Sequence, residues 1–257
     1  MHNILSKTQI QSFVTDGFIR IDNAFSADLA TEARAILWKD LSAKPDDPAT
    51  WESPVVWLGM YTQQPFVMAA NTEVLHTAFD LLVGKDKWAP CMSMGAFPVR
   101  FPSEKDSGDT GWHVDASFAG ENPNDFFAAR INFKSKGRAL LMLFLFSDVT
   151  ELDAPTRLLK GSHIDVARLL KPEGEAGLSF MELAQKLPDL PARPEALATG
   201  KAGTVYLCHP FLVHAAQRHR GKEPKFMAQP PLFPKTAFEI EGMGPFSPVE
   251  EAIRIVL

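Results

Sequence analysis

The spacing of hydrophobic and polar positions changes near residue 90. Before it, apolar residues over 29–37 recur at i, i+4, i+7 and i+8, which places them on one face of a helix. Related patterns predict a helix that Ser6 caps and another over 72–83, and the alternation over 18–21 predicts a short strand. We therefore expect residues 1–90 to be mostly helical and to support a sheet.

From Cys91 onward, short strand-like runs are separated by Gly, Pro, Asp and Ser. Two helical pieces, one after Ser162 and one opening at Ser179, form an insert at about 163–195. The expected strands are 92–101, 112–118, 126–133, 138–149, 156–159, 203–208, 211–216 and 226–232. These runs predict a mainly β fold with flanking helices, of the jelly-roll kind. We interpret 1–257 as one domain, with 91–257 as its jelly-roll core.

The amino-acid composition argues against membrane-spanning, nucleic-acid-binding and secreted proteins. Hydrophobic residues make up 46% and charged residues 22%, and no apolar run reaches the roughly 18 residues that a membrane span needs. The net charge of −5 argues against a nucleic-acid partner, since such binding depends on clustered Lys and Arg. The first residues lack the apolar core of a secretory signal. Cys91 and Cys208 have apolar neighbours and are expected to be buried thiols, so we expect a cytoplasmic location.

The first candidate for chemistry is a histidine and an aspartate two residues apart. His113 and Asp115 lie on the expected strand 112–118, so their side chains should leave the same face. With a second histidine they would form the triad that holds Fe(II) on three sites and leaves the others open. The pair alone is weak evidence for a metal site. A His and an Asp that only form hydrogen bonds to backbone groups at the end of a strand would have the same sequence pattern.

Three histidines compete to be the third ligand. His209 and His214 are five residues apart and would face opposite sides of one strand, and Pro210 makes a turn after His209. Apolar neighbours enclose His214. His219 lies in a basic turn and is expected to be exposed. A fourth, His163, is expected to satisfy backbone groups at the turn before a helix.

Several segments together resemble the phytanoyl-CoA dioxygenase-like branch of the Fe(II)/2-oxoglutarate oxygenases. The resemblance implies a double-stranded β-helix of cupin type, Fe(II) as the metal and 2-oxoglutarate as cosubstrate. It also implies His113, Asp115 and His214 as metal ligands, with His214 preferred over His209. The matching segments are Leu5 to Ile21, Trp112-His113-Val114-Asp115, Ala154 to His163 and His209 to His214.

The resemblance also points to the cosubstrate site. The family binds the far carboxylate of 2-oxoglutarate with an arginine eleven residues after the distal histidine, and here that position is Lys225. A lysine keeps the charge but lacks the planar fork of arginine. Thr156 could assist the same carboxylate, and Arg220 is the fallback cation. Arg157 is expected to point the other way.

The implied reaction is the oxidation of a small-molecule substrate by O2, with 2-oxoglutarate converted to succinate and CO2. Hydroxylation is the expected outcome, and Asp115 disfavours halogenation because related halogenases have a small residue there. The family pattern is also altered at Lys160, Ala216 and His219. Two alternatives stay open: a metal-binding jelly-roll protein without catalysis, and a zinc-dependent hydrolase, which could use the same ligands.

The sequence does not identify the substrate or the oligomeric state. Aromatic residues that could line an apolar mouth are Trp51, Trp57, Tyr61, Phe97 and Phe118. Such residues also occur in ordinary cores. Arg100 or Arg130 could meet an anionic group of the substrate.

Overall fold

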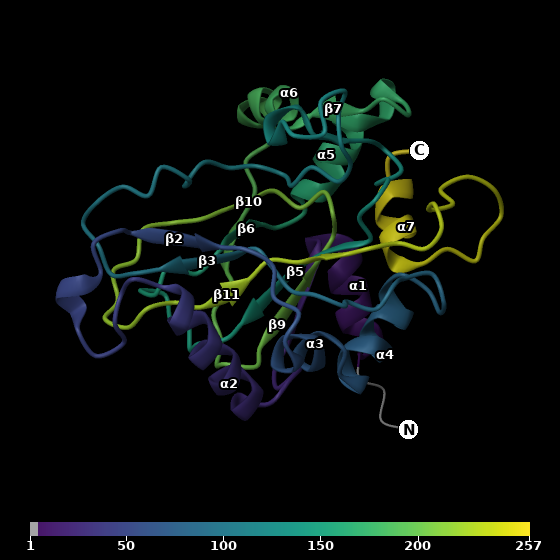
Figure 1. Ribbon diagram of the computed structural model, residues 1–257. Helices are drawn as coiled ribbons and strands as arrows, with labels where there is room; N and C mark the ends of the chain where they lie inside the picture. Colours follow the sequence, from purple (N-terminus) through teal and green to yellow (C-terminus); the bar gives the residue numbers. More distant parts are fainter. Residues whose placement is uncertain (1–4) are drawn as a thin grey trace.

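The structure is a computed structural model that describes residues 5–257. Residues 1–4, the start of the segment expected to lack a secretory signal, lie outside the described residues. In the view of Figure 1, helices lie at one end of the strands and also above and below them. The α-helices are α1 (Lys7–Asp16), α2 (Ala27–Leu37), α3 (Gln64–Ala70), α4 (Glu73–Leu82), α5 (Ser162–Leu170), α6 (Phe180–Lys186) and α7 (Pro248–Arg254). Short 3-10 helices are η1 (Trp38–Asp40), η2 (Pro48–Thr50), η3 (Phe126–Ala128), η4 (Lys171–Glu173) and η5 (Leu187–Asp189).

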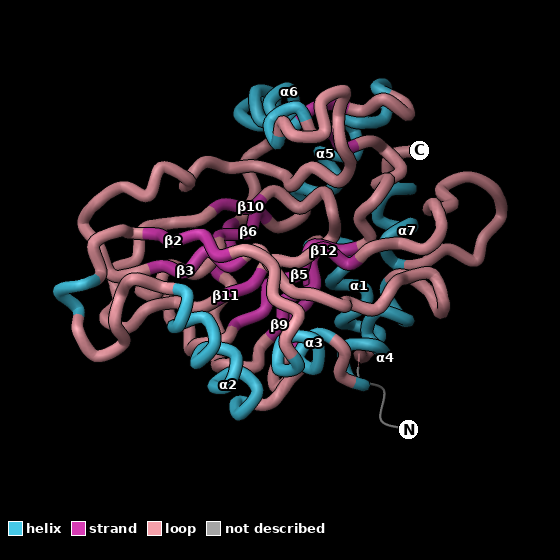
Figure 2. The backbone as a smooth tube through the Cα atoms, viewed as in Figure 1, coloured by secondary structure: helices cyan, strands magenta, loops and turns pink. Residues whose placement is uncertain are grey.

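The strands are short and lie in the middle of the molecule (Figure 2). They are β1 (Phe18–Ile21), β2 (Val55–Leu58), β3 (Phe97–Arg100), β4 (Arg130–Ile131), β5 (Leu140–Leu145), β6 (Arg157–Leu159), β7 (Leu178–Ser179), β8 (Glu195–Leu197), β9 (Val205–Cys208), β10 (His214–Ala215), β11 (Met227–Ala228) and β12 (Pro231–Leu232). One sheet has the order β1-β9-β5-β11, with β12 also paired to β5, and a second has the order β10-β6-β8. Two further pairs, β2-β3 and β4-β7, complete the jelly roll.

The central strand β5 shows how the layers are held together. All six of its residues are apolar and buried. Alternate side chains leave opposite faces of a strand, and the two faces of β5 belong to two different apolar clusters. Met142 and Phe144 join the cluster that contains the helices, whereas Leu141 and Leu143 join a smaller cluster with Leu158 of the second sheet. The helices therefore cover one face of the large sheet, and the other face packs on the small sheet.

Most helices predicted from periodicity are confirmed. Ser6 caps α1 through a capping box with Gln9, and the helix ends at Gly17, whose φ is 87°. The predicted insert contains α5 and α6, and the latter opens with the capping box of Ser179 and Glu182. The sequence patterns did not predict β2, α3, β8 or α7. None of the helices in the described part of the chain has the length and apolar character needed to cross a bilayer.

One of the predicted strands is wrong, and the one predicted over 126–133 is shortened to β4. Residues 112–118 form no regular strand and pair only through single bridges, His113 with His214 and Phe118 with Arg130. Residues 126–133 begin with η3, where Asp125 accepts hydrogen bonds from the backbone of Phe127 and Ala128. Local turns therefore replace the strand geometry in the segment that crosses the cavity.

Cys91 and Cys208 are free and buried, as predicted. The interpretation of 1–257 as one domain stays a prediction.

Gly17 offers a test of how the amino-terminal helix is joined to the sheet. A Cβ atom at this position would lie 2.5 Å from His163 Nδ1 and 2.8 Å from Leu212 Cδ1, and its φ is unfavourable for other residues. We predict that Gly17→Ala lowers the free energy of unfolding by about 1 to 3 kcal/mol. Gly59→Ala is the control, because a Cβ there meets nothing within 4 Å. Equal urea midpoints for the two variants would contradict the prediction.

Candidate metal centre

A cavity of about 630 Å³ opens above the place where His113, Asp115 and His214 meet. His214 begins β10, while the other two residues belong to the irregular segment before η3. Reciprocal backbone hydrogen bonds join the segments: His113 N donates to His214 O (3.0 Å) and His214 N donates to His113 O (2.9 Å). These bonds bring together residues that are about 100 positions apart in the chain.

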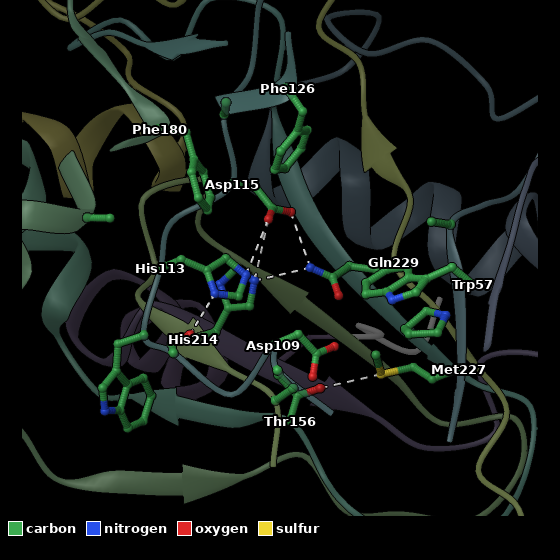
Figure 3. Close-up of a pocket in the computed structure, with 18 of the residues that line it drawn as sticks. Trp57, Asp109, His113, Asp115, Phe126, Thr156, Phe180, His214, Met227 and Gln229 are labelled. Atoms are coloured by element: carbon green, nitrogen blue, oxygen red, sulfur yellow. Dashed lines mark hydrogen bonds and ion pairs between the residues drawn. The ribbon is translucent and has the colours of Figure 1, made fainter. Parts of the chain in front are cut away.

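The three side chains point toward one another (Figure 3). Asp115 Oδ1 lies 3.7 Å from His113 Nε2 and 3.6 Å from His214 Nε2. Metal–ligand bonds of about 2.0 to 2.2 Å allow two ligands of one ion to lie up to about 4.4 Å apart. The measured separations therefore suit a single ion bound by two imidazoles and one carboxylate.

Backbone carbonyls fix the orientation of both imidazoles. His113 Nδ1 lies 2.9 Å from Gly111 O, and His214 Nδ1 lies 3.0 Å from Leu212 O. A carbonyl can only accept, so each Nδ1 carries the proton and each Nε2 keeps its lone pair. Burial, together with His113, lowers the pKa of His214, which keeps this ring neutral. In both rings the nitrogen that faces Asp115 is thus Nε2, the atom that a divalent metal would bind.

The second oxygen of Asp115 is held by two other side chains. Gln229 Nε2 donates to Asp115 Oδ2 (3.2 Å) and lies 3.1 Å from His214 Nε2, while Arg138 Nη1 lies 3.3 Å from Asp115 Oδ2. Burial alone would raise the pKa of Asp115, but the charge of Arg138 and the hydrogen bond from Gln229 act in the opposite direction, and that pKa is lowered. Asp115 is therefore an anion whose free oxygen, Oδ1, faces the imidazoles.

The other histidines lie away from this cluster. His209 is fully buried on the opposite side, with Nε2 3.4 Å from Val249 O, in agreement with the preference for His214. His163 is also buried and bonds to Val14 O of α1 (3.0 Å), so it satisfies a distant backbone carbonyl instead of its own turn. The prediction that His219 is exposed is wrong. Its side chain is buried, because the turn folds back over Asp153 and Ser103.

Two buried cations form the inner end of the cavity. Lys225 is 1% exposed and Arg100 is 3% exposed, and both line the cavity together with Thr156. Lys225 Nζ donates to Ala154 O (2.5 Å), and Arg100 forms an ion pair with Asp109.

Arg220 and Arg157 lie elsewhere. Arg220 is exposed and does not line the cavity. The Arg157 guanidinium stacks over the Trp112 ring (4.3 Å) and turns away from the cavity, as expected.

Aromatic side chains form the mouth of the cavity. Phe126, Phe127 and Phe180 contact one another with ring centroids 5.2 to 6.1 Å apart, and Phe180 also lies 5.9 Å from the His113 ring. Trp57, 58% exposed, lines the same cavity. Exposed apolar side chains gathered at a cavity mark a ligand surface.

Most of the other aromatic candidates from the sequence do not line the cavity. Tyr61 and Phe97 are buried in the core, and Trp51 packs on Phe101. Phe118 lies under Lys136, and Arg130 bonds to the carbonyl of Gly177. Trp57 and Arg100 are the candidates that the cavity includes.

Gln229, Arg138, Asp109 and the phenylalanine mouth, formed by Phe126, Phe127 and Phe180, were not predicted from the sequence. For Gln229 a signal was present: Lys225, Met227 and Gln229 alternate along one stretch, and all three line the cavity. Residues spaced by two share a face of an extended chain, so the position of Lys225 could have led to Gln229. Asp109 and Arg138 lie in or beside irregular segments, and the three phenylalanines come from two separate elements, η3 and α6, so no spacing rule predicts that they share a face.

The fold and the cluster define the chain as a jelly-roll protein with two histidines and one carboxylate that suit a metal. The sequence profile of the family described as Phytanoyl-CoA dioxygenase (PhyH) matches residues 13–227. The chain therefore belongs to this family. Among curated proteins, none is similar enough in sequence to match it.

Solved structures share the fold at low sequence identity. The non-heme alpha ketoglutarate dependent carbocyclase SnoK from nogalamycin biosynthesis is 18% identical, with a TM-score of 0.59 over 91% of this chain and 86% of SnoK. HygX from Streptomyces hygroscopicus, solved with nickel, 2-oxoglutarate and hygromycin B, is 16% identical, with a TM-score of 0.54 over 91% and 90%. GIG2 from Candida albicans is 14% identical, with a TM-score of 0.58 over 93% of this chain and 65% of GIG2.

Gln229 tests whether the support of Asp115 matters for metal binding. We predict that Gln229→Leu, which keeps the size but loses the donor, weakens binding of a divalent ion about tenfold. Competition with a chelating dye under anaerobic conditions measures this affinity, and Gln64→Leu, the same change at an exposed position of α3, is the control. Unchanged or tighter binding would show that the amide competes with the ion for His214 and would contradict the prediction.

Proposed function

We propose that the protein is an Fe(II)- and 2-oxoglutarate-dependent dioxygenase that hydroxylates a small-molecule substrate. In this proposal His113, Asp115 and His214 hold the iron, and Lys225 with Thr156 binds the far carboxylate of 2-oxoglutarate. The observation that carries it is the convergence of the three ligand atoms, with both imidazoles presenting Nε2 lone pairs. Membership of the family supports the assignment, as do the metal and 2-oxoglutarate in the HygX structure.

The donor set fits iron. Two neutral imidazoles and one carboxylate are the ligands of the facial triad of non-haem Fe(II) oxygenases, which leaves positions open for other ligands. The iron, when bound with 2-oxoglutarate and O2, supplies oxidative decarboxylation to succinate and CO2 together with the power to oxidise a C–H bond. The protein's part is to hold the ion, orient its ligands and seat the cosubstrate and substrate.

Each group of cavity residues has a separate task. Arg138 and Gln229 hold Asp115 with Oδ1 toward the ion. Lys225, at the inner end, binds the far carboxylate of a dicarboxylic acid through its ammonium group and so orients the molecule in the cavity. The phenylalanine mouth excludes water and presents flat apolar faces to the primary substrate, so we propose that the reacting part of this substrate is apolar. Arg220 is exposed, and we no longer assign it to the cosubstrate.

Two other functions remain to be distinguished by experiment. A metal-binding jelly-roll protein without catalysis would hold iron but form no succinate. A zinc-dependent hydrolase would act without O2, but it has no use for a buried cation opposite its metal. A cytoplasmic location and the absence of nucleic-acid and membrane partners stay predictions from the composition.

Anaerobic addition of Fe(II) and 2-oxoglutarate to the metal-free protein tests the proposal. We predict a weak visible charge-transfer band from the chelate, and succinate once air is admitted. The band is lost in His113→Ala and in His214→Ala because each removes a ligand. His76→Ala, a histidine substitution on α4 far from the cavity, should keep it. Absence of the band in the unaltered protein at saturating cosubstrate, or its persistence in His214→Ala, would contradict the proposal.

Lys225 makes cosubstrate binding depend on pH. Burial, and then Arg100, lowers its pKa well below the ordinary value, while Asp109 and Asp153 partly oppose this. His219 also faces it and stays neutral, since burial lowers its pKa to about 4. A bound carboxylate adds a negative charge, so the pKa of Lys225 rises in the complex. Affinity is therefore highest below the lowered pKa of the free protein and falls as pH rises toward the higher pKa of the complex.

This linkage predicts proton uptake when 2-oxoglutarate binds. Isothermal titration calorimetry in buffers of different ionisation enthalpy should give uptake approaching about one proton per site within that pH window. Lys225→Met should show none, whereas the exposed Lys222→Met should behave like the unaltered protein. No proton uptake at any pH would contradict the prediction.

A further inference from the structure

The two cations at the inner end of the cavity are direct neighbours. Arg100 N donates to Lys225 O (3.0 Å) and Lys225 N donates to Arg100 O (2.8 Å), so β3 and the segment before β11 are joined at this point. Both side chains are almost fully buried. Two adjacent buried basic groups repel each other when both are charged, so the charged form of Lys225 is unfavourable beside Arg100 until an anion compensates it.

Asp109 supplies a compensating charge to Arg100. Arg100 Nη1 donates to Asp109 Oδ1 (3.1 Å) and Nη2 donates to Oδ2 (2.5 Å), which is the two-pronged geometry that a guanidinium offers to a carboxylate. Ser107 Oγ donates to the same carboxylate (2.6 Å). Burial would raise the pKa of Asp109, but Arg100 and Ser107 outweigh it and lower that pKa, so Asp109 stays charged.

Lys225 has no such partner within residues 5–257. Its hydrogen-bond partner is a neutral carbonyl, that of Ala154, and no carboxylate lies within ion-pair distance. The cavity end therefore holds two basic side chains and one carboxylate, which contacts Arg100 and not Lys225. A ligand carboxylate that reached both Arg100 and Lys225 would serve the two better than Asp109 does.

Asp109 and Arg100 differ in how freely they can move. Arg100 lies on β3 and its side chain is 4% exposed, whereas the side chain of Asp109 is 25% exposed. Asp109 also belongs to the irregular segment 102–112, which has neither helix nor strand. Of the two partners, Asp109 is the one that can leave for solvent without disturbing a sheet.

We propose that Asp109 is an internal competitor of the cosubstrate. Arg100 provides the planar fork that Lys225 lacks, and the far carboxylate of 2-oxoglutarate takes the place of Asp109 on Arg100 while it also contacts Lys225. Arg100 thereby becomes a cosubstrate-binding residue, and the segment 102–112 is released from the cavity wall when 2-oxoglutarate binds. This inference rests on the proposed function.

A purely structural ion pair makes a different prediction. If Asp109 only fastened its segment to β3, its loss would lower stability and leave the affinity for 2-oxoglutarate unchanged or weaker. As a competitor, it lowers that affinity, so its loss strengthens binding. Pyruvate is the control ligand. It has the 2-oxo acid group that chelates a metal but lacks the far carboxylate of 2-oxoglutarate, so it reports on metal chelation alone.

The test is anaerobic titration of the Fe(II)-loaded protein with 2-oxoglutarate and, separately, with pyruvate. Asp109→Asn should lower the dissociation constant for 2-oxoglutarate on the order of tenfold, since one competing charge is removed. Asp106→Asn, the same change at an exposed position of the same segment, should have no effect. Arg100→Gln should weaken 2-oxoglutarate on the order of tenfold or more. None of the three should alter pyruvate binding.

The outcomes separate this inference from the proposed function. If the unaltered protein binds no 2-oxoglutarate, both are wrong. If it does and Asp109→Asn binds no more tightly than Asp106→Asn, or if pyruvate binding changes in parallel, the competitor role alone is wrong.

A measurement on the unaltered protein covers the case in which a variant does not fold. Hydrogen exchange of residues 102–112 should be faster with 2-oxoglutarate bound than with pyruvate bound, because only 2-oxoglutarate displaces Asp109. Equal or slower exchange with 2-oxoglutarate would overturn the proposal.

Discussion

The antiparallel bridge between His113 and His214 is the constraint on which the site depends. Two backbone hydrogen bonds fix where the irregular segment crosses β10, and the two side chains then meet on one side of it. Each imidazole is turned by a carbonyl two residues before it, Gly111 O for one and Leu212 O for the other. The ligand geometry is therefore set by backbone, and a single slip in pairing would separate His214 from Asp115.

The cavity is organised as two charged ends and an apolar opening. At the metal end, Asp115 faces two imidazoles and is backed by Arg138. At the inner end, Arg100 and Lys225 face one carboxylate. A ligand that carries a chelating group at one end and an anion at the other matches both, while the phenylalanine mouth leaves room for an apolar molecule beside it. The charged groups of the cavity thus lie where they can meet the two charged ends of a 2-oxo dicarboxylic acid.

Sequence patterns correctly predicted those helices and strands in which the spacing of apolar residues matches the face that is buried in the structure. The helix ended by Gly17, the helix with Gly84 after it and the apolar strand over 140–145 all follow from that agreement. The choice of His214 over His209 also followed from the alternation of a strand, and the structure places His209 on the opposite side.

The remaining features depend on contacts between distant segments. Residues 112–118 look like a strand but pair through single bridges, because turns on both sides interrupt the ladder. His219 was expected at the surface, yet the turn that carries it folds over Asp153. Asp109 reaches Arg100 from a segment with no periodic pattern, so no spacing rule could have indicated the pair.

X-ray absorption spectroscopy at the iron edge of the Fe(II)-loaded protein tests most directly whether the bridged residues share one ion. We predict imidazole scattering from two histidines per iron, with the remaining neighbours being oxygen, and a further change in the oxygen shell when 2-oxoglutarate is added. Iron surrounded by oxygen alone, with no histidine scattering, would contradict this prediction.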